Sequence, residues 1–142
     1  MQRTKSSVDE YLARPADPTL TAMDAIITGA LTARGRALWT GVFWGGTEQE
    51  TIGYTDIVQP RPRGASVEWF AVGPARQKNH YGLYVNVAED GRYLSKTYAD
   101  RLGRVKVGTA AVTFKDVDAF DREALVEMLR HIGRISGGAG AG

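Results

Sequence analysis

Residues 37–88 change from a helical to a strand-like hydrophobic period, and this change constrains the fold more than any other feature of the chain. Gly, Pro or charged turns separate four segments there that are rich in β-branched and aromatic residues: ALWTGVFW, TIGYTDIV, ASVEWFAV and HYGLYVNV. Short connections favour antiparallel neighbours. The sequence therefore predicts a four-strand meander.

Helical patterns precede this region. The S-x-x-E motif from Ser7 to Glu10 is a capping box for a short helix. Asp17-Pro18 begins a second helix, which we expect to end near Gly35. Its apolar residues recur at intervals of three and four, which predicts one buried stripe. That stripe consists of Leu20, Met23, Ile27, Ala30 and Leu31.

A helix, a strand and a helix follow the meander. We expect a short helix over 92–103, a fifth strand over 109–114 and a final helix that opens at Asp118. The apolar stripe of this final helix consists of Leu125, Met128, Leu129 and Ile132. Together these elements predict an α+β fold, with an antiparallel sheet of about five strands and N-terminal and C-terminal helices packed on it.

Length and composition fit one domain. We expect residues 1–135 to form it, and residues 136–142, SGGAGAG, to be a flexible tail. The chain has no cysteine, which excludes disulfides, thiolate metal sites and a cysteine nucleophile. The formal net charge of +2 gives little support to nucleic-acid binding. No apolar run is long enough to span a membrane and no secretory signal is visible, so we expect a cytoplasmic protein.

Motifs for catalysis are missing. His80 and His131 lie on different elements, and neither accompanies a nucleophile signature. We therefore expect a protein that is not an enzyme. The carboxylates Asp116, Asp118 and Asp121 are candidates for a labile metal ion, because carboxylate oxygens suit iron, manganese or magnesium. Helix capping and a solvated face explain the same residues without a metal.

Aromatic and polar residues of the meander are candidates for a ligand site. Strand alternation places Tyr81, Leu83, Val85 and Val87 on the core face and Tyr84 on the other face. Within ASVEWFAV, alternation puts Trp69 and Ala71 on one face and Phe70 on the other. An open second face would offer an apolar surface with a few polar groups, as small-molecule sites do. Core packing explains the aromatic residues without any ligand, and it is the simpler interpretation. The candidate ligand-binding residues are Trp39, Tyr54, Trp69, Arg76, Gln77, Lys78, His80 and Tyr84.

The order of motifs resembles the bacterial YdhG-like family, a domain of unknown function. The resemblance rests on SVDEYLA, on W-x-G followed by I-G-Y, on the hairpin W-F…Q-K-N-x-x-x-L-Y-V, and on LGRVKVGTAAVTFKDVD. It implies an α+β fold with terminal helices against an antiparallel sheet. It also implies a link to frataxin-like iron chaperones, as some members are described. Lys78, Lys106, Asp116 and Asp118 match family positions.

We expect a binding domain that holds a small molecule or a protein partner at the sheet face near Lys78 and His80. The alternative is labile iron binding through surface carboxylates, and a weaker alternative is an enzyme without a recognisable motif. We expect no cofactor other than a labile iron ion. We expect binding neither to nucleic acid nor to a membrane. The sequence leaves the oligomeric state open, including a weak homodimer.

Overall fold

The fold is described from a computed structural model of the chain. Its description covers residues 2–5, 7–13, 17–31, 36–42, 48–59, 67–77, 79–108 and 111–141. Lys78 lies outside these ranges, as do Phe43, Trp44 and residues 60–66.

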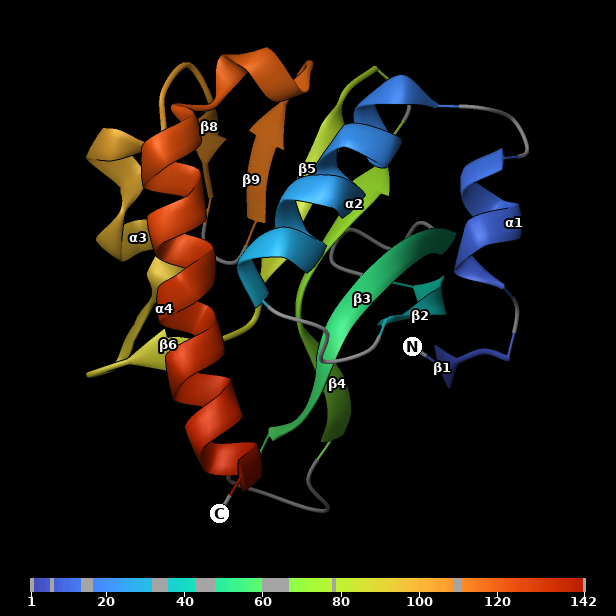
Figure 1. The fold of residues 1–142 in the computed structure, drawn as a ribbon, viewed down its shortest axis with the longest axis horizontal. Helices are drawn as coiled ribbons and strands as arrows, with labels where there is room; N and C mark the ends of the chain where they lie inside the picture. The colour runs from blue at the N-terminus through green and yellow to red at the C-terminus, as the bar shows by residue number, and fades with distance from the viewer. Residues whose placement is uncertain are drawn as a thin grey trace.

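One antiparallel sheet forms the centre of the molecule (Figure 1). Its strand order is β1-β2-β3-β4-β5-β9-β8, and every neighbouring pair is antiparallel. The strands are β1 Gln2–Arg3, β2 Arg36–Val42, β3 Glu48–Gln59, β4 Val67–Arg76, β5 Tyr81–Val85, β8 Lys106–Val107 and β9 Ala111–Phe114. The predicted meander is confirmed as β2 to β5, and the predicted fifth strand is β9. The α+β class is therefore confirmed.

Short strands extend the sheet beyond the five that we expected. Strands β1 and β8 form its two edges, and a separate hairpin pairs β6 Ala88–Glu89 with β7 Arg92–Tyr93. Each of these four strands has two residues, which is too short for an alternating pattern to appear in the sequence. These strands are recognised in the structure by the neighbouring strand with which each one pairs.

Four helices accompany the sheet in the described residues: α1 Val8–Ala13, α2 Pro18–Leu31, α3 Leu94–Thr97 and α4 Arg122–Ala141. Single 3₁₀ turns occupy Ala99–Arg101 and Val117–Ala119. The expected caps are present. The Ser7 hydroxyl accepts a hydrogen bond from the Glu10 N–H at 3.2 Å, and Asp17 Oδ1 accepts from the N–H groups of Thr19 and Leu20. No described helix is long and apolar enough to cross a membrane.

Helix α4 begins and ends later than the sequence indicated. It starts at Arg122 instead of Asp118, because Asp121 is the residue whose carboxylate caps it, accepting from the Ala124 N–H at 3.0 Å. Its backbone continues to Ala141, so residues 136–141 are helical where we expected a flexible tail. Glycine and alanine can both adopt helical angles, and a nucleated helix extends at low cost.

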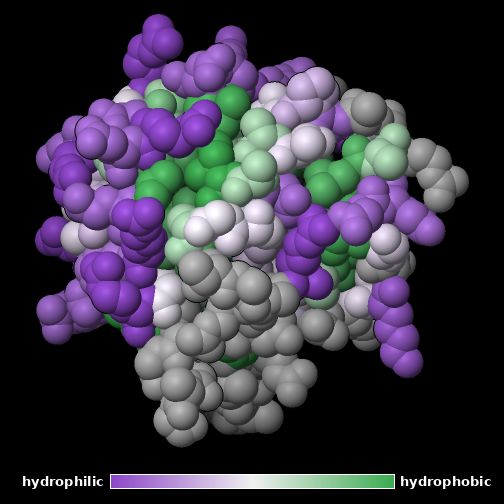
Figure 2. Space-filling view, viewed as in Figure 1, coloured by the Kyte–Doolittle hydropathy of each residue, from purple (hydrophilic) through white to green (hydrophobic). Residues whose placement is uncertain are grey.

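Helices α2 and α4 pack side by side on one face of the sheet (Figure 1). The predicted stripes lie in the core: Leu20, Met23, Ile27 and Leu31 of α2 and Leu125, Met128, Leu129 and Ile132 of α4 are buried. Strand residues Leu83, Val85 and Val87 join them, as alternation predicted. On the outside of this layer, Figure 2 shows hydrophilic residues over α3 and α4, with hydrophobic residues reaching the surface beside α2.

The opposite face of the sheet, here called the far face, carries a second apolar cluster. It consists of Ala37, Trp39, Phe70, Ala75 and Tyr84, with Trp69 and Ala111 packed against it. All helical residues in the two described clusters belong to the main core, and none belongs to the far-face cluster.

Candidate functional site

Glycines make room for the aromatic residues of the far face. A Cβ on Gly53 would lie 2.6 Å from Trp39 Cδ1 and 2.7 Å from Phe70 Cβ, and a Cβ on Gly73 would lie 3.0 Å from Phe70 Cε1. Trp39 and Phe70 thus occupy space that a side chain at these glycines would need, and their ring centroids are 5.7 Å apart, with the rings tilted by 51°. Only glycine permits this close approach.

Trp69 is the accessible member of the cluster. Its ring stacks on Phe70 with centroids 5.0 Å apart and meets Trp39 edge-on at 6.0 Å. Trp69 is half-buried, whereas Trp39 and Phe70 are buried. Alternation had placed Trp69 and Phe70 on opposite faces, and that prediction is wrong. Thr55 of the neighbouring strand has φ 63°, an uncommon angle for a β-branched residue, and such irregularities interrupt strand alternation.

Two opposed residues of the far face each carry a buried polar atom without a hydrogen-bond partner in the described part of the chain. Trp39 and Thr51 are directly opposed on β2 and β3. Among the residues that the structure describes, neither Trp39 Nε1 nor Thr51 Oγ1 has a hydrogen-bond partner, and the same is true of Thr55 Oγ1 and Ser95 Oγ. Most buried polar side-chain atoms in proteins are hydrogen-bonded. An unpaired indole N–H and an unpaired hydroxyl on two opposed residues therefore require an explanation.

Gln77 and Tyr84 provide the polar end of this face. Gln77 Nε2 donates to the Tyr84 hydroxyl at 3.1 Å, and the Gln77 amide lies over Gly82, where a Cβ would approach it to 3.2 Å. His80 is half-buried, and its carbonyl accepts from the Gln77 N–H at 2.9 Å in the turn between β4 and β5. Lys78, which follows Gln77 in the sequence, is outside the described residues.

Arg76 belongs to a network with buried Asp17. Arg76 Nη1 lies 3.3 Å from Asp17 Oδ2, and the Tyr81 hydroxyl donates to the same carboxylate at 2.9 and 3.0 Å. Burial, and then the hydrogen bond to Asp17, raise the pKa of Tyr81. This network ties the start of α2 to β4 and β5. Arg76 therefore serves an internal ion pair, although 39% of its side chain is exposed.

Tyr54 lies on the helix-covered face, apart from the far-face aromatic residues. Its hydroxyl donates to Asp24 Oδ1 at 2.6 Å, and Arg36 Nη1 binds the same oxygen at 2.8 Å. Burial, and then Asp24, raise the pKa of Tyr54. Partial burial alone would lower the pKa of Arg36, but its hydrogen bond to Asp9 and the charge of Asp24 outweigh this and raise it.

The three candidate metal ligands are not brought together as a ligand set. Asp116 Oδ1 accepts from the Asp118 N–H at 2.9 Å, and Asp121 caps α4. Asp118 is exposed. Among the residues that the structure describes, no three His, Cys, Asp or Glu side chains gather closely enough to hold a metal ion. The geometry shows capping at two of the three positions.

A hydrogen-bonded chain that the sequence did not indicate connects β6, α4 and the turn after α3. The Tyr98 hydroxyl lies 2.9 Å from His131 Nδ1, and His131 Nε2 lies 3.0 Å from Glu89 Oε1. Arg101 stacks over the Tyr98 ring at 5.4 Å and pairs with Glu127 at 2.6 Å. Burial, and then the charge of Glu127, raise the pKa of Tyr98. The partners of His131 are 33 and 42 positions away in the sequence, so no local pattern indicates them.

Comparisons of the chain with protein-family models, with curated proteins and with solved structures found no match. The resemblance to the YdhG-like family therefore stays a prediction.

Proposed function

We propose that this chain is a non-catalytic binding domain that holds a small molecule with a flat ring and an accepting oxygen on the far face of the sheet. The observation that supports this proposal concerns two buried polar atoms, Trp39 Nε1 and Thr51 Oγ1. Neither has a hydrogen-bond partner among the described residues, and the two residues are directly opposed on β2 and β3. An unsatisfied buried polar group costs about 1–3 kcal/mol. A ligand oxygen that accepts from the indole N–H and meets the Thr51 hydroxyl would remove that cost.

The surrounding side chains fit a ring. Trp69 stacks with Phe70 and meets Trp39 edge-on, and it is half-buried, so part of its side chain is exposed to solvent beside two aromatic rings. Ligand sites are mostly apolar with a few placed polar groups. The far face has this composition, with Trp39, Phe70 and Trp69 as the apolar part and the Gln77–Tyr84 pair as the polar end.

The far-face cluster is suited to orienting a ligand. Tyr84 is its only titratable residue in the described part of the chain, and the Tyr84 hydroxyl accepts from Gln77. General acid–base catalysis needs a group that exchanges a proton near neutral pH. This set of side chains can orient a ligand but supplies no such group.

Calorimetric titration with benzamide tests the proposal, since benzamide combines a flat ring with a carbonyl acceptor. Cyclohexanecarboxamide, which lacks the flat ring, is the matched ligand. Thr51→Val removes the unpaired hydroxyl at nearly constant shape. It should stabilise the fold and weaken benzamide binding about fivefold, the worth of one modest hydrogen bond.

Trp69→Leu should weaken benzamide binding as well, because it removes the exposed ring. Thr97→Val, the same change at an exposed position of α3, is the control and should leave binding unchanged. Absence of saturable benzamide binding, or equal affinity in wild type, Thr51→Val and Trp69→Leu, would show the proposal to be wrong.

A further inference from the structure

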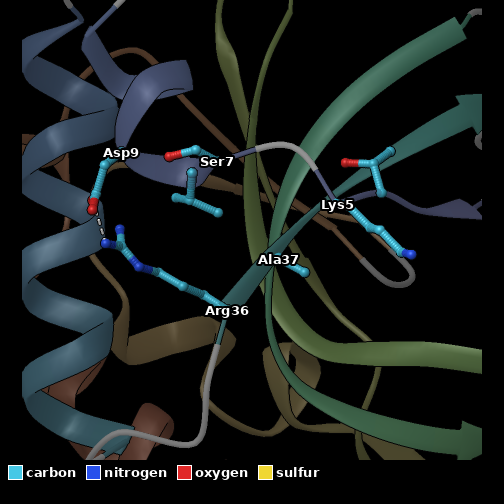
Figure 3. Close-up of a pocket in the computed structure, with 7 residues that line it drawn as sticks. Lys5, Ser7, Asp9, Arg36 and Ala37 are labelled. Atoms are coloured by element: carbon cyan, nitrogen blue, oxygen red, sulfur yellow. Dashed lines mark hydrogen bonds and ion pairs between the residues drawn. The ribbon is translucent and has the colours of Figure 1, made fainter.

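A hollow of about 340 Å³ opens between the N-terminal segment, the start of α1 and the start of β2 (Figure 3). Two cations, Lys5 and Arg36, line it together with the Asp9 carboxylate and the hydroxyl groups of Thr4 and Ser7. These residues come from three separate segments. No local sequence motif indicates the hollow.

Arg36 binds two carboxylates that differ in their surroundings. Arg36 Nη1 holds Asp24, whose side chain is 17% exposed and is fixed by the Tyr54 hydroxyl at 2.6 Å. Arg36 Nη2 holds Asp9, whose side chain is 80% exposed (Figure 3). Exposed ion pairs contribute little net free energy because water competes for both partners. Asp9 is therefore the carboxylate that another anion can replace.

The remaining polar groups of the hollow favour an anion. Lys5 is exposed and has no ion-pair partner among the described residues. The Ser7 hydroxyl accepts from the Glu10 N–H, which uses a lone pair and leaves its hydrogen to donate. Arg36 adds a planar guanidinium, the geometry that binds carboxylate and phosphate oxygens in pairs.

We propose that the hollow binds a small oxyanion, a phosphate or a carboxylate, which replaces Asp9 on Arg36 Nη2 and gains Lys5 as a second cation. Asp9 then acts as an internal competitor that occupies the guanidinium while the site is empty. The main core is unaffected, since Asp24 keeps its place on Arg36 Nη1 and on Tyr54.

Titrations with inorganic phosphate and with acetate, at low and constant ionic strength, test this inference. Asp9→Asn removes the competing charge at constant shape and should strengthen anion binding about two- to fivefold, the range expected from one exposed ion pair. Lys5→Met should weaken binding by a similar factor. Tighter binding of phosphate would identify phosphate-bearing ligands, and tighter binding of acetate would identify carboxylates.

Matched controls separate the site from the overall charge. Asp100→Asn and Lys96→Met make the same charge changes at exposed positions outside the lining of the hollow, and neither should alter binding. The inference is overturned by either of two results: no saturable binding of phosphate or acetate to Asp9→Asn, or equal effects of Asp9→Asn and Asp100→Asn. The Lys5→Met comparison remains decisive if Asp9→Asn fails to fold. Neither result bears on benzamide binding at the far face.

Discussion

The Tyr81 hydroxyl donates to both carboxylate oxygens of Asp17, at 3.0 and 2.9 Å, across 64 positions of sequence. Asp17 also caps α2 and pairs with Arg76. One buried carboxylate thus satisfies the first turn of a helix and joins that helix to two strands. Its several partners make it a sensitive point for the stability of the fold.

Removing the Tyr81 hydroxyl should lower the free energy of unfolding. We expect Tyr81→Phe to cost about 1 kcal/mol, less than a fully buried hydrogen bond to a charge, because Tyr81 is half-buried. Asp17→Ala should cost about 2–3 kcal/mol, since it removes the helix cap as well. Urea denaturation measures both. Tyr93→Phe is the control, and an equal loss in Tyr93→Phe and Tyr81→Phe would contradict the role of Asp17.

Tyr54 should make the protein less stable at alkaline pH. Its pKa is raised above the ordinary 10.0 by burial and then by Asp24, so the folded state keeps the proton that the unfolded state loses. Unfolding then releases a proton, and stability falls as pH rises above about 10, by about 1.4 kcal/mol per pH unit for this residue. Urea midpoints across this range should fall less steeply in Tyr54→Phe. Identical slopes in the two proteins would rule out the buried phenol as the cause.

Alanine at the far-face glycines should be destabilising. Gly53→Ala meets Trp39 and Phe70, and we expect a loss of about 1–3 kcal/mol from overpacking. Gly73→Ala should cost more, because the obstacle is the Ile52 carbonyl oxygen at 2.2 Å, which is backbone. Gly29→Ala, in α2 with nothing within 4 Å, should gain up to about 1 kcal/mol. Thermal unfolding of the three variants checks this order, and a stable Gly73→Ala variant would contradict the packing described.

His131 should adopt one defined tautomer. An ionised Glu89 can only accept, so the neutral imidazole must carry its hydrogen on Nε2, and Nδ1 then accepts from the Tyr98 hydroxyl. Nitrogen-15 chemical shifts at slightly alkaline pH should show a protonated Nε2 and a bare Nδ1. The opposite assignment would mean that the Glu89 contact does not exist in solution. Glu89→Gln, whose amide can donate as well as accept, should relax the preference.

Regular features of the fold could be predicted from the sequence because they repeat. The stripes of α2 and α4, the four meander strands and the caps at Ser7 and Asp17 all follow from local periodicity or from spacing within one turn. Two-residue strands have no period, and their existence depends on neighbours far along the chain. Residue Thr55, at φ 63°, shows a second limit, since it lies beside the place where alternation fails for Trp69 and Phe70.

The candidate site was less predictable, because its contacts are long-range. Strand alternation predicted that Tyr84 lies on the other face of the sheet from Leu83 and Val85, and this is confirmed. Tyr54 was also a candidate ligand-binding residue, but the structure places it in the main core, where its hydroxyl donates to Asp24. Arg76 had been read as a ligand-facing cation, and it pairs with Asp17. A long side chain on a strand end can reach either a ligand or a nearby helix, and only the position of α2 decides between them.

The indole N–H resonance of Trp39 tests the central claim most directly, because the proposal assigns this unpartnered donor to a ligand oxygen. In a nitrogen-15 correlation spectrum, addition of benzamide should shift the Trp39 indole signal downfield until it saturates, as expected when a donor gains an acceptor. The Trp69 signal should move with the same affinity. If benzamide binds and the Trp39 signal stays in place, the far face is not the binding site and the account is contradicted.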